Sequence, residues 1–219
     1  MEKLVIVGNT EHAVTMFNYI HNTGFGDVVA FCVNEKYITK SVLMDKPVIA
    51  AEHILELYDK NSIKLILGVG YNKMGNVKRN LFNLFTGMGY EFVNYIHPSA
   101  LIGEDVVLGS GNNILEGTIL ESGVEIGDGN LLFGGAMIAH DTKVGNFNSF
   151  SVKSVLAGCS TVMNHCFVGA NATVRDHVIL NDYVLVGAGA YADRSLEEYS
   201  VLAAQKSVLL EGKRSTDFL

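Results

Sequence analysis

Two residues with acid–base chemistry stand side by side at positions 140 and 141, where a histidine is followed by an aspartate. An imidazole can accept a proton from an attacking nucleophile, and a neighbouring carboxylate can orient the ring and fix its tautomer. Gly158 follows 18 residues later, and no side chain obstructs its backbone N–H. Such an N–H can stabilise the oxyanion of a tetrahedral intermediate. If His140, Asp141 and Gly158 meet in the fold, they have the parts of an acyl-transfer site.

A six-residue repeat brings these positions together. From residue 102 onward, every sixth position carries an aliphatic side chain or phenylalanine, and the register never slips. The positions are Ile102, Leu108, Ile114, Leu120, Ile126, Leu132, Ile138, Val144, Phe150, Leu156, Val162, Val168, Val174, Leu180 and Val186. This repeat is typical of a left-handed parallel β-helix, in which three hexapeptides make one triangular coil. The sequence therefore predicts a β-helix from about Ile102 to about Ala192, with residues 18 apart lying one above the other.

Residues 1–97 follow a different pattern, in which short apolar runs alternate with helical stretches. We expect strands at Lys3–Gly8, Val28–Val33, Pro47–Ile49, Leu65–Gly70 and Glu91–Ile96, and helices at Glu11–Asn22, Ala51–Lys60 and Met74–Met88. Strands that alternate with helices favour a parallel sheet of the Rossmann-like type. The sequence thus predicts two domains, a Rossmann-like α/β domain over residues 1–97 and an all-β β-helix domain with a C-terminal tail over residues 98–219.

Two loops follow predicted strands of the α/β domain and are expected to form the walls of one cleft. The first loop contains Gly8, Asn9, Thr10, Glu11 and His12, and the second contains Gly70, Tyr71, Asn72 and Lys73. The first loop lacks the GxGxxG signature of dinucleotide binding, but a strand end that opens a helix still attracts phosphate. His12 could add a donor there. Glu11 would repel phosphate, or it serves only as a charge partner for the helix N-terminus.

The composition excludes several classes of protein. The net charge of -7 argues against a nucleic-acid binder. The three cysteines have no CxxC spacing, so neither a disulfide framework nor a zinc signature is expected. No apolar run approaches the roughly 20 residues of a membrane helix, and the apolar run at the N-terminus is too short for a signal peptide. These features predict a cytoplasmic protein without a membrane partner.

The chain resembles the bacterial nucleotide-sugar acetyltransferases of the NeuD and PglD kind, over nearly its whole length. The most specific segments are IVGNTEHA, GVGYNK, YIHPSALIG, the hexapeptide run and AMIAHDTKVGNF. The resemblance implies a Rossmann-like domain that binds a nucleotide sugar and a β-helix that binds acetyl-CoA, without a metal. It also implies a homotrimer with active sites between subunits. The implied reaction acetylates the amino group of a dTDP- or UDP-linked amino-dideoxy sugar, in polysaccharide or glycan biosynthesis.

The resemblance also implies roles for single residues of the β-helix. His140 matches the general base of the family, Asp141 an adjacent acidic residue, and Gly158 the backbone contact to the acetyl oxygen. Ala170 and Ala188 match contacts to the pantetheine arm of CoA. The remaining expected cofactor contacts are Gly187 and Lys206. Lys206 would contact CoA phosphates, although a solvated tail is an equal alternative.

The α/β domain departs from the family pattern at several positions. His12 matches the histidine of the family's phosphate loop, but Glu11 stands where glycine is usual. The second predicted strand ends in Val33 and Asn34 instead of an acidic pair, and Asn34 could still bond the edge of a pyrimidine. Ser149 stands where some members have a second active-site histidine. The sequence therefore leaves UDP and dTDP both open.

Two alternative functions remain open from the sequence. The first is a sugar O-acetyltransferase of the sialic-acid type, in which a hydroxyl replaces the amine as the nucleophile. The second is a hexapeptide-repeat protein that binds or scaffolds without catalysis.

Overall fold

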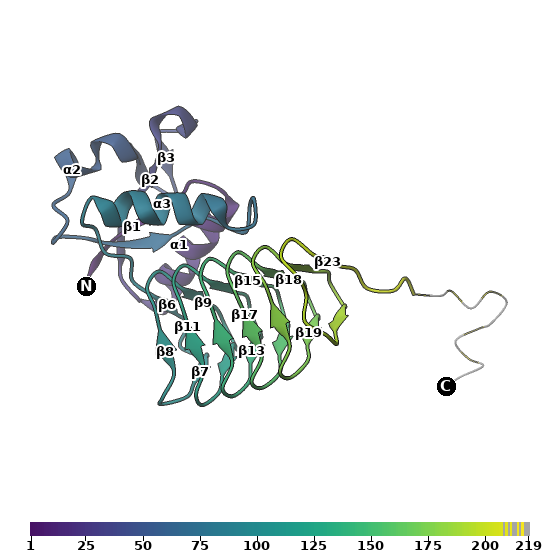
Figure 1. Cartoon of the computed structure of the whole chain (residues 1–219). Coiled ribbons are helices and arrows are strands. Elements are labelled where there is room, and N and C mark those ends of the chain that lie inside the picture. Colours follow the sequence, from purple (N-terminus) through teal and green to yellow (C-terminus); the bar gives the residue numbers. More distant parts are fainter. Residues whose placement is uncertain (208, 210, 212–213, 215, 217–219) are drawn as a thin grey trace.

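The α/β region at the N-terminus is built on a five-stranded sheet, and a stack of parallel coils follows it (Figure 1). The computed structural model describes residues 1–207, 209, 211, 214 and 216. The strand order is β3-β4-β2-β1-β5, with β3 antiparallel to β4 and the others parallel. The strands are β1 (Lys3–Val7), β2 (Asp27–Val33), β3 (Val42–Leu43), β4 (Lys46–Ala50) and β5 (Lys64–Leu67). The helices are α1 (Glu11–Thr23), α2 (Ile54–Leu57), α3 (Asn76–Gly87) and the 3₁₀-helices η1 (Glu35–Tyr37) and η2 (Ala51–His53).

Alternating side chains of β1, which lies between β2 and β5, place helices on both faces of this sheet. Leu4 and Ile6 of β1 share a buried cluster with Met16 of α1. Val5 and Val7 point to the opposite face and share a second cluster, to which α3 contributes Phe82 and Phe85. The period of two along a strand explains this division. Helix α1 ends where Gly24 adopts a left-handed conformation (φ 66°), which lacks a steric cost at glycine.

Three details of this region differ from the sequence prediction. The predicted helix over 51–60 shrinks to η2 and the one-turn α2. The short antiparallel strand β3 was not expected. The predicted strand over 91–96 splits, because Phe92 forms only an isolated bridge with Leu65, whereas β6 (Tyr95–Ile96) pairs with the β-helix. The coils thus begin at β6 and extend to β23 (Val201–Leu202), beyond the predicted run.

The β-helix has three parallel sheets, one on each side of the triangular coil. The covered face, which packs against the α/β region, contains β6 (Tyr95–Ile96), β9 (Asn113–Ile114), β12 (Leu131–Leu132), β15 (Ser149–Phe150), β18 (Phe167–Val168), β21 (Leu185–Val186) and β23. The apolar face contains β7 (Leu101–Ile102), β10 (Ile119–Leu120), β13 (Met137–Ile138), β16 (Val155–Leu156), β19 (Thr173–Val174) and β22 (Tyr191–Ala192). The mixed face contains β8 (Val107–Leu108), β11 (Glu125–Ile126), β14 (Lys143–Val144), β17 (Thr161–Val162) and β20 (Ile179–Leu180).

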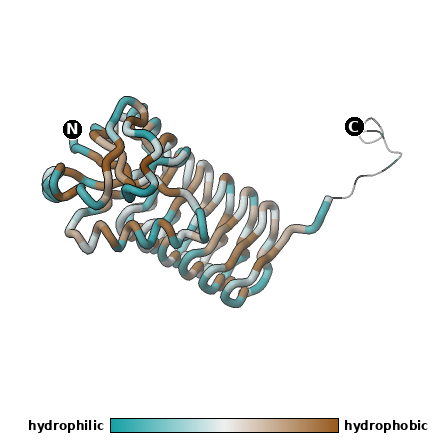
Figure 2. The backbone as a smooth tube through the Cα atoms, turned by 90° about the horizontal axis from the view of Figure 1, so that it is seen from above, coloured by the Kyte–Doolittle hydropathy of each residue, from teal (hydrophilic) through white to brown (hydrophobic). Residues whose placement is uncertain are grey.

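The strands pair in a register of 18 residues, as the repeat predicted. Met137 pairs with Val155, and Val155 with Thr173. The side chain at every sixth position points inward, and from Ile114 to Val186 each of these residues is at most 5% exposed. Apolar segments accordingly recur in every coil (Figure 2). These stacked parallel strands fit the predicted left-handed parallel β-helix.

From residue 111 to residue 189, each corner of the coil contains a residue with positive φ, three positions after the inward-facing residue. We call these the left-handed corner residues. They are Gly111, Gly117, Gly123, Gly129, Gly135, Asp141, Phe147, Lys153, Cys159, His165, Asn171, His177, Tyr183 and Gly189. A residue other than glycine in this conformation costs roughly 1–2 kcal/mol. Hydrogen bonds between coils offset the cost: for example, the N–H groups of Asp141 and Cys159 donate to the carbonyls of Ser122 and His140 (3.0 and 2.9 Å).

Buried polar contacts attach the covered face to the α/β region. Asn113 Nδ2 donates to the carbonyl oxygen of Leu67 at 2.7 Å. Lys78 of α3 is fully buried, and its Nζ donates to the carbonyl of Asn148 and to Ser149 Oγ (3.0 and 3.3 Å). A buried polar group without a partner would be costly, so these contacts fix the sheet against the coils. The predicted limit between two domains near residue 97 remains a prediction.

The apolar face has no covering segment among the described residues. Its outward side chains are Leu101, Ile119, Met137, Val155, Thr173 and Tyr191. Leu101 is 65% exposed and Tyr191 is 56% exposed. The four residues between them are partly exposed. A largely apolar row of this kind marks an interaction site. No helix within the described part of the chain is long and apolar enough to cross a membrane.

Candidate active site and nucleotide cleft

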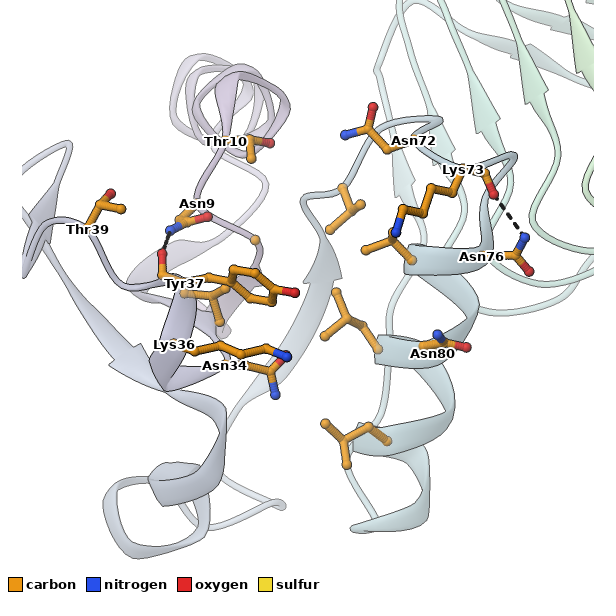
Figure 3. A pocket seen from close by; sticks show the side chains of 16 residues that line it. Asn9, Thr10, Asn34, Lys36, Tyr37, Thr39, Asn72, Lys73, Asn76 and Asn80 are labelled. Carbon is orange, nitrogen blue, oxygen red and sulfur yellow. Dashed lines mark hydrogen bonds between the residues drawn. The ribbon is translucent and has the colours of Figure 1, made fainter.

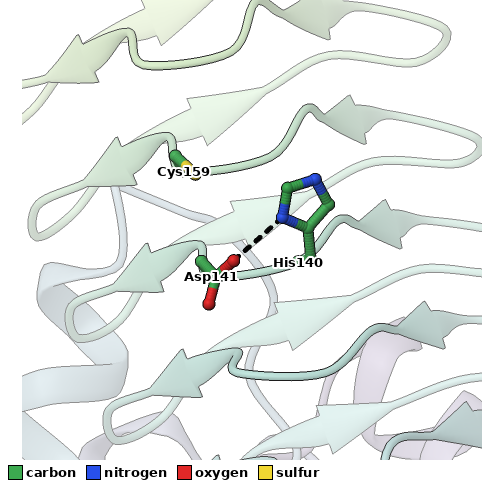
Figure 4. A group of neighbouring side chains, drawn as sticks. All are labelled: His140, Asp141 and Cys159. Carbon is green, nitrogen blue, oxygen red and sulfur yellow. Dashed lines mark hydrogen bonds and ion pairs between the residues drawn. The ribbon is translucent and has the colours of Figure 1, made fainter.

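The corner between the apolar and mixed faces brings His140, Asp141 and Gly158 together. Figure 4 shows the first two side chains. His140 follows β13 and Asp141 precedes β14, so the coil register places residue 158 directly over residue 140. His140 Nδ1 and Asp141 Oδ2 are 2.9 Å apart. A Cβ atom added to Gly158 would lie 2.5 Å from His140 Nε2. A side chain at position 158 would therefore displace the imidazole from the place it occupies here.

Acidic groups around His140 favour its protonated form. The hydrogen bond with Asp141, and the negative charges of Asp141 and Glu121, raise the pKa of His140, and slight desolvation opposes them. Glu121 Oε2 also accepts a hydrogen bond from the backbone N–H of His140 at 2.9 Å. The ring is 59% exposed, so Nε2 is open to a substrate. This arrangement suits a general base whose imidazolium form is stabilised once it has taken a proton.

Cys159 lies beside His140 and Asp141 at the same corner. It is a left-handed corner residue stacked one coil beyond Asp141. One ligand atom from each of His140, Asp141 and Cys159 lies within 4.8 Å of the other two. The other two cysteines, Cys32 and Cys166, are buried elsewhere, and all three thiols are free.

A cleft with a volume of about 670 Å³ lies at the carboxyl ends of β1, β2 and β5 (Figure 3). Its polar lining is formed by Gly8, Asn9, Thr10, Asn34, Lys36, Tyr37, Thr39, Asn72, Lys73, Asn76 and Asn80. Gly8 is required for the loop after β1, because a Cβ atom there would lie 2.5 Å from the carbonyl oxygen of Gly68. The lining has two lysines and no acidic residue, which favours an anionic ligand.

The sequence located this cleft but missed part of its lining. Six predicted residues line it: Gly8, Asn9, Thr10, Asn34, Asn72 and Lys73. The residues that the sequence missed come from η1 and the segment after it, and from the first turns of α3. They are Lys36, Tyr37, Thr39, Asn76 and Asn80. A polar stripe at positions 72, 73, 76 and 80 at helical spacing was the available signal.

Three other predicted cleft residues, His12, Gly70 and Tyr71, are not part of this lining. Tyr71 packs on Phe167 and Phe133 of the β-helix, with ring centroids 5.0 and 6.3 Å apart. The ring of His12 meets Phe133 edge-on at 6.1 Å, and its Nε2 is buried without a hydrogen-bond partner among the described residues. Burial, and then the charge of Lys78, lower the pKa of His12 to about 4. The structure thus places a neutral His12 against the β-helix.

The predicted cofactor residues occupy two corners of the β-helix. Gly158 shares its corner with His140. Ala170, Gly187 and Ala188 lie at the corner between the covered and apolar faces, where Gly189 N–H donates to the Ala170 carbonyl at 2.8 Å. The apolar face separates these two corners. Lys206 lies beyond β23, in a segment that leaves the stack (Figure 1).

No protein-family model matches the chain. Solved structures do match it. The chain is similar to PerB from Caulobacter crescentus, solved with CoA and GDP-perosamine, at 25% identity and a TM-score of 0.81 over 92% of this chain and 93% of that one. The predicted resemblance to nucleotide-sugar acetyltransferases is confirmed. The prediction that the chain is an acyltransferase is confirmed with it.

Two further structures share the fold. The acetyltransferase domain of PglB from Neisseria gonorrhoeae FA1090 matches at 20% identity with a TM-score of 0.78, and WeeI from Acinetobacter baumannii AYE at 16% with a TM-score of 0.79. Each covers 92% of this chain and 96% of the other. The α/β region and the β-helix therefore occur together in these proteins.

Proposed function

We propose that this acyltransferase moves the acetyl group of acetyl-CoA to the amino group of a nucleotide-linked amino-dideoxy sugar. Acetyl-CoA is its co-substrate: the similar PerB structure holds CoA, and that of the PglB domain has been solved with acetyl coenzyme A. Nucleotide-sugar N-acetylation is supported by PerB, which was solved with GDP-perosamine. The observation that carries the mechanism is the position of the His140 imidazole against Gly158, in the space that a side chain at this position would fill.

The mechanism that we propose is direct attack. The amine nitrogen attacks the thioester carbonyl, His140 Nε2 takes the proton that the nitrogen loses, and the C–S bond breaks to release CoA thiolate. Asp141 holds Nδ1 and stabilises the imidazolium that forms. The Gly158 N–H stabilises the oxyanion. This chemistry uses groups of the chain and the two substrates alone.

The cleft is the site that we assign to the nucleotide. The parallel strands have the order β4-β2-β1-β5, which is that of half a Rossmann-type sheet, and the cleft lies outside the carboxyl ends where such sheets bind ligands. We infer that Lys73 and the loop Gly8–Thr10 contact the diphosphate. The side chain of Asn34 donates to Glu52 Oε1 (3.3 Å), so its carbonyl oxygen is left to accept from a base N–H. Uracil and thymine both offer one.

A homotrimer would bring the nucleotide cleft of one copy to the His140 corner of a neighbouring copy. No residue of the β-helix lines the cleft, and His140 lies on a corner that does not border the covered face. A cleft occupant therefore needs a neighbouring copy to meet a catalytic histidine. The exposed apolar face, bounded by the His140 corner and the Ala170 corner, is the surface that we assign to this contact. Analytical ultracentrifugation tests the trimer.

A substrate panel tests the function. The purified chain is incubated with acetyl-CoA and with dTDP-, UDP- or GDP-linked 4-amino-4,6-dideoxy sugars, and the products are weighed by mass spectrometry. We expect one acetyl group added to an amine of a dTDP or UDP sugar. Sugars that carry a hydroxyl in place of the amine serve as the matched control, since their acetylation would instead support an O-acetyltransferase. The absence of acetyl-CoA binding by calorimetry would favour a non-catalytic protein.

A further inference from the structure

A histidine, an aspartate and a cysteine converge on one corner of the β-helix (Figure 4). One atom from each of His140, Asp141 and Cys159 lies within 4.8 Å of the other two. An imidazole nitrogen, a carboxylate oxygen and a thiolate sulfur are the ligand types that zinc uses in proteins. We propose that these three side chains bind one zinc ion, and that the bound ion inhibits acetyl transfer by occupying His140.

The backbone brings the three residues together before any ion arrives. Asp141 and Cys159 are left-handed corner residues exactly one coil apart, with φ of 56° and 58°. The Cys159 N–H donates to the carbonyl oxygen of His140 at 2.9 Å and ties the two coils together. Zinc bonds of about 2.0–2.3 Å in a tetrahedron require ligand atoms about 3.3–3.8 Å apart. The present spacings are 2.9 Å between His140 Nδ1 and Asp141 Oδ2 and at most 4.8 Å within the group, and rotation of the exposed side chains of His140 and Asp141 adjusts them to these values.

The charges of the corner also suit a divalent cation. The Cys159 thiol loses its proton to solvent on binding, so one thiolate and one carboxylate neutralise the charge of the ion. Glu121 adds a second carboxylate close by, because its Oε2 accepts a hydrogen bond from the backbone N–H of His140 at 2.9 Å. Three protein ligands leave the fourth position of a tetrahedral ion to water. The site is therefore reversible and of lower affinity than a four-ligand structural site.

Zinc binding and its effect on the reaction are separable. The inhibitory effect rests on the proposed function, since it requires His140 to act as the base. The binding itself does not, because it depends only on the three side chains. Cys159 has no role in the proposed acetyl transfer, so its removal abolishes the metal site while leaving the catalytic groups intact.

A titration of the full chain with Co²⁺ and Zn²⁺, without substrates, tests the binding. CoA is left out because its thiol also binds zinc. We expect one ion per chain and a thiolate-to-cobalt charge-transfer band. Cys159→Ser removes the band and weakens zinc binding at least tenfold, because serine is a poor zinc ligand. Cys166→Ser, which alters a buried thiol at another corner, leaves both unchanged. Equal zinc affinity in Cys159→Ser and the wild type, or the absence of a thiolate band, would overturn the site.

An acetylation assay then tests the inhibition. Added zinc should lower the initial rate of the wild type, a chelator should restore it, and Cys159→Ser should keep its basal rate at the same zinc concentration. A wild-type rate that saturating zinc leaves unchanged contradicts the inhibitory role. If no sugar of the panel is acetylated, the proposed function fails, and the cobalt titration still decides the metal site.

Discussion

The candidate active-site corner and the boundary between the α/β region and the coils shift the pKa values of their basic side chains in opposite directions. His140 stands on an exposed corner beside carboxylates, which raise its pKa. His12 and Lys78 are enclosed between the sheet and the coils, where burial lowers their pKa values to about 4 and about 7. The corner thus favours the protonated form of His140, whereas the boundary disfavours the charged forms of His12 and Lys78. This contrast assigns acid–base chemistry to the coils and leaves recognition to the neighbouring cleft.

The strongest test of this division is the removal of the imidazole. His140→Asn should lower turnover roughly 10²–10⁴-fold, the usual contribution of a general base, while the KM for the nucleotide sugar changes little. Steady-state kinetics with the best sugar of the panel measures both parameters. His12→Asn is the companion variant, and it should retain most of its turnover. A similar loss of turnover in both variants would erase the contrast between the two histidines.

Adding a methyl group at position 158 should give the next largest loss of turnover. In Gly158→Ala the new methyl group meets the His140 ring at 2.5 Å and displaces it. Misplacement of a catalytic group by about 1 Å can cost on the order of 10²-fold in rate, so we expect a loss of that size in kcat.

Gly87→Ala is a suitable control for this variant, because nothing lies within 4 Å of the added atom. Circular dichroism should show both variants folded. Full activity of a folded Gly158→Ala would mean that the ring has another productive position.

A substitution in the cleft lining should change the KM for the nucleotide sugar and not the turnover. Lys73→Ala removes a cation from the lining. A charged hydrogen bond contributes about 1.5–3 kcal/mol, so the KM for the nucleotide sugar should rise about tenfold or more at unchanged KM for acetyl-CoA. Lys40→Ala, an exposed lysine outside the lining, should leave both constants unchanged. A fall in kcat alone would move Lys73 from recognition to catalysis.

The smallest expected effect lies in the pH profile. The base works when it is neutral, so kcat/KM should fall as the pH drops below the pKa of His140. Because Asp141 raises this pKa, Asp141→Asn should move the acidic limb to lower pH. Rates measured across pH 5–9 test the direction. A limb that stays in place would show that another group sets it.

The two regions also differ in how far their sequence predicts them. In the coils, each inward-facing residue repeats the same local environment, so a six-residue count placed Gly158 over His140 without knowledge of the structure. No such repeat exists around the cleft. Tyr37 and Asn80 line the cleft. Their positions there depend on the path of η1 and the direction of α3. The burial of His12 depends on Phe133, which is 121 residues away in sequence.

The left-handed corner residues have an evolutionary consequence. At the corner of the candidate active site, successive coils place Gly123, Asp141, Cys159 and His177 at this same position. The backbone there is held by hydrogen bonds between coils and not by the side chain. Mutation can therefore exchange one reactive group for another along this edge while the scaffold keeps its shape. New chemistry can arise at such a corner by single substitutions, one coil at a time.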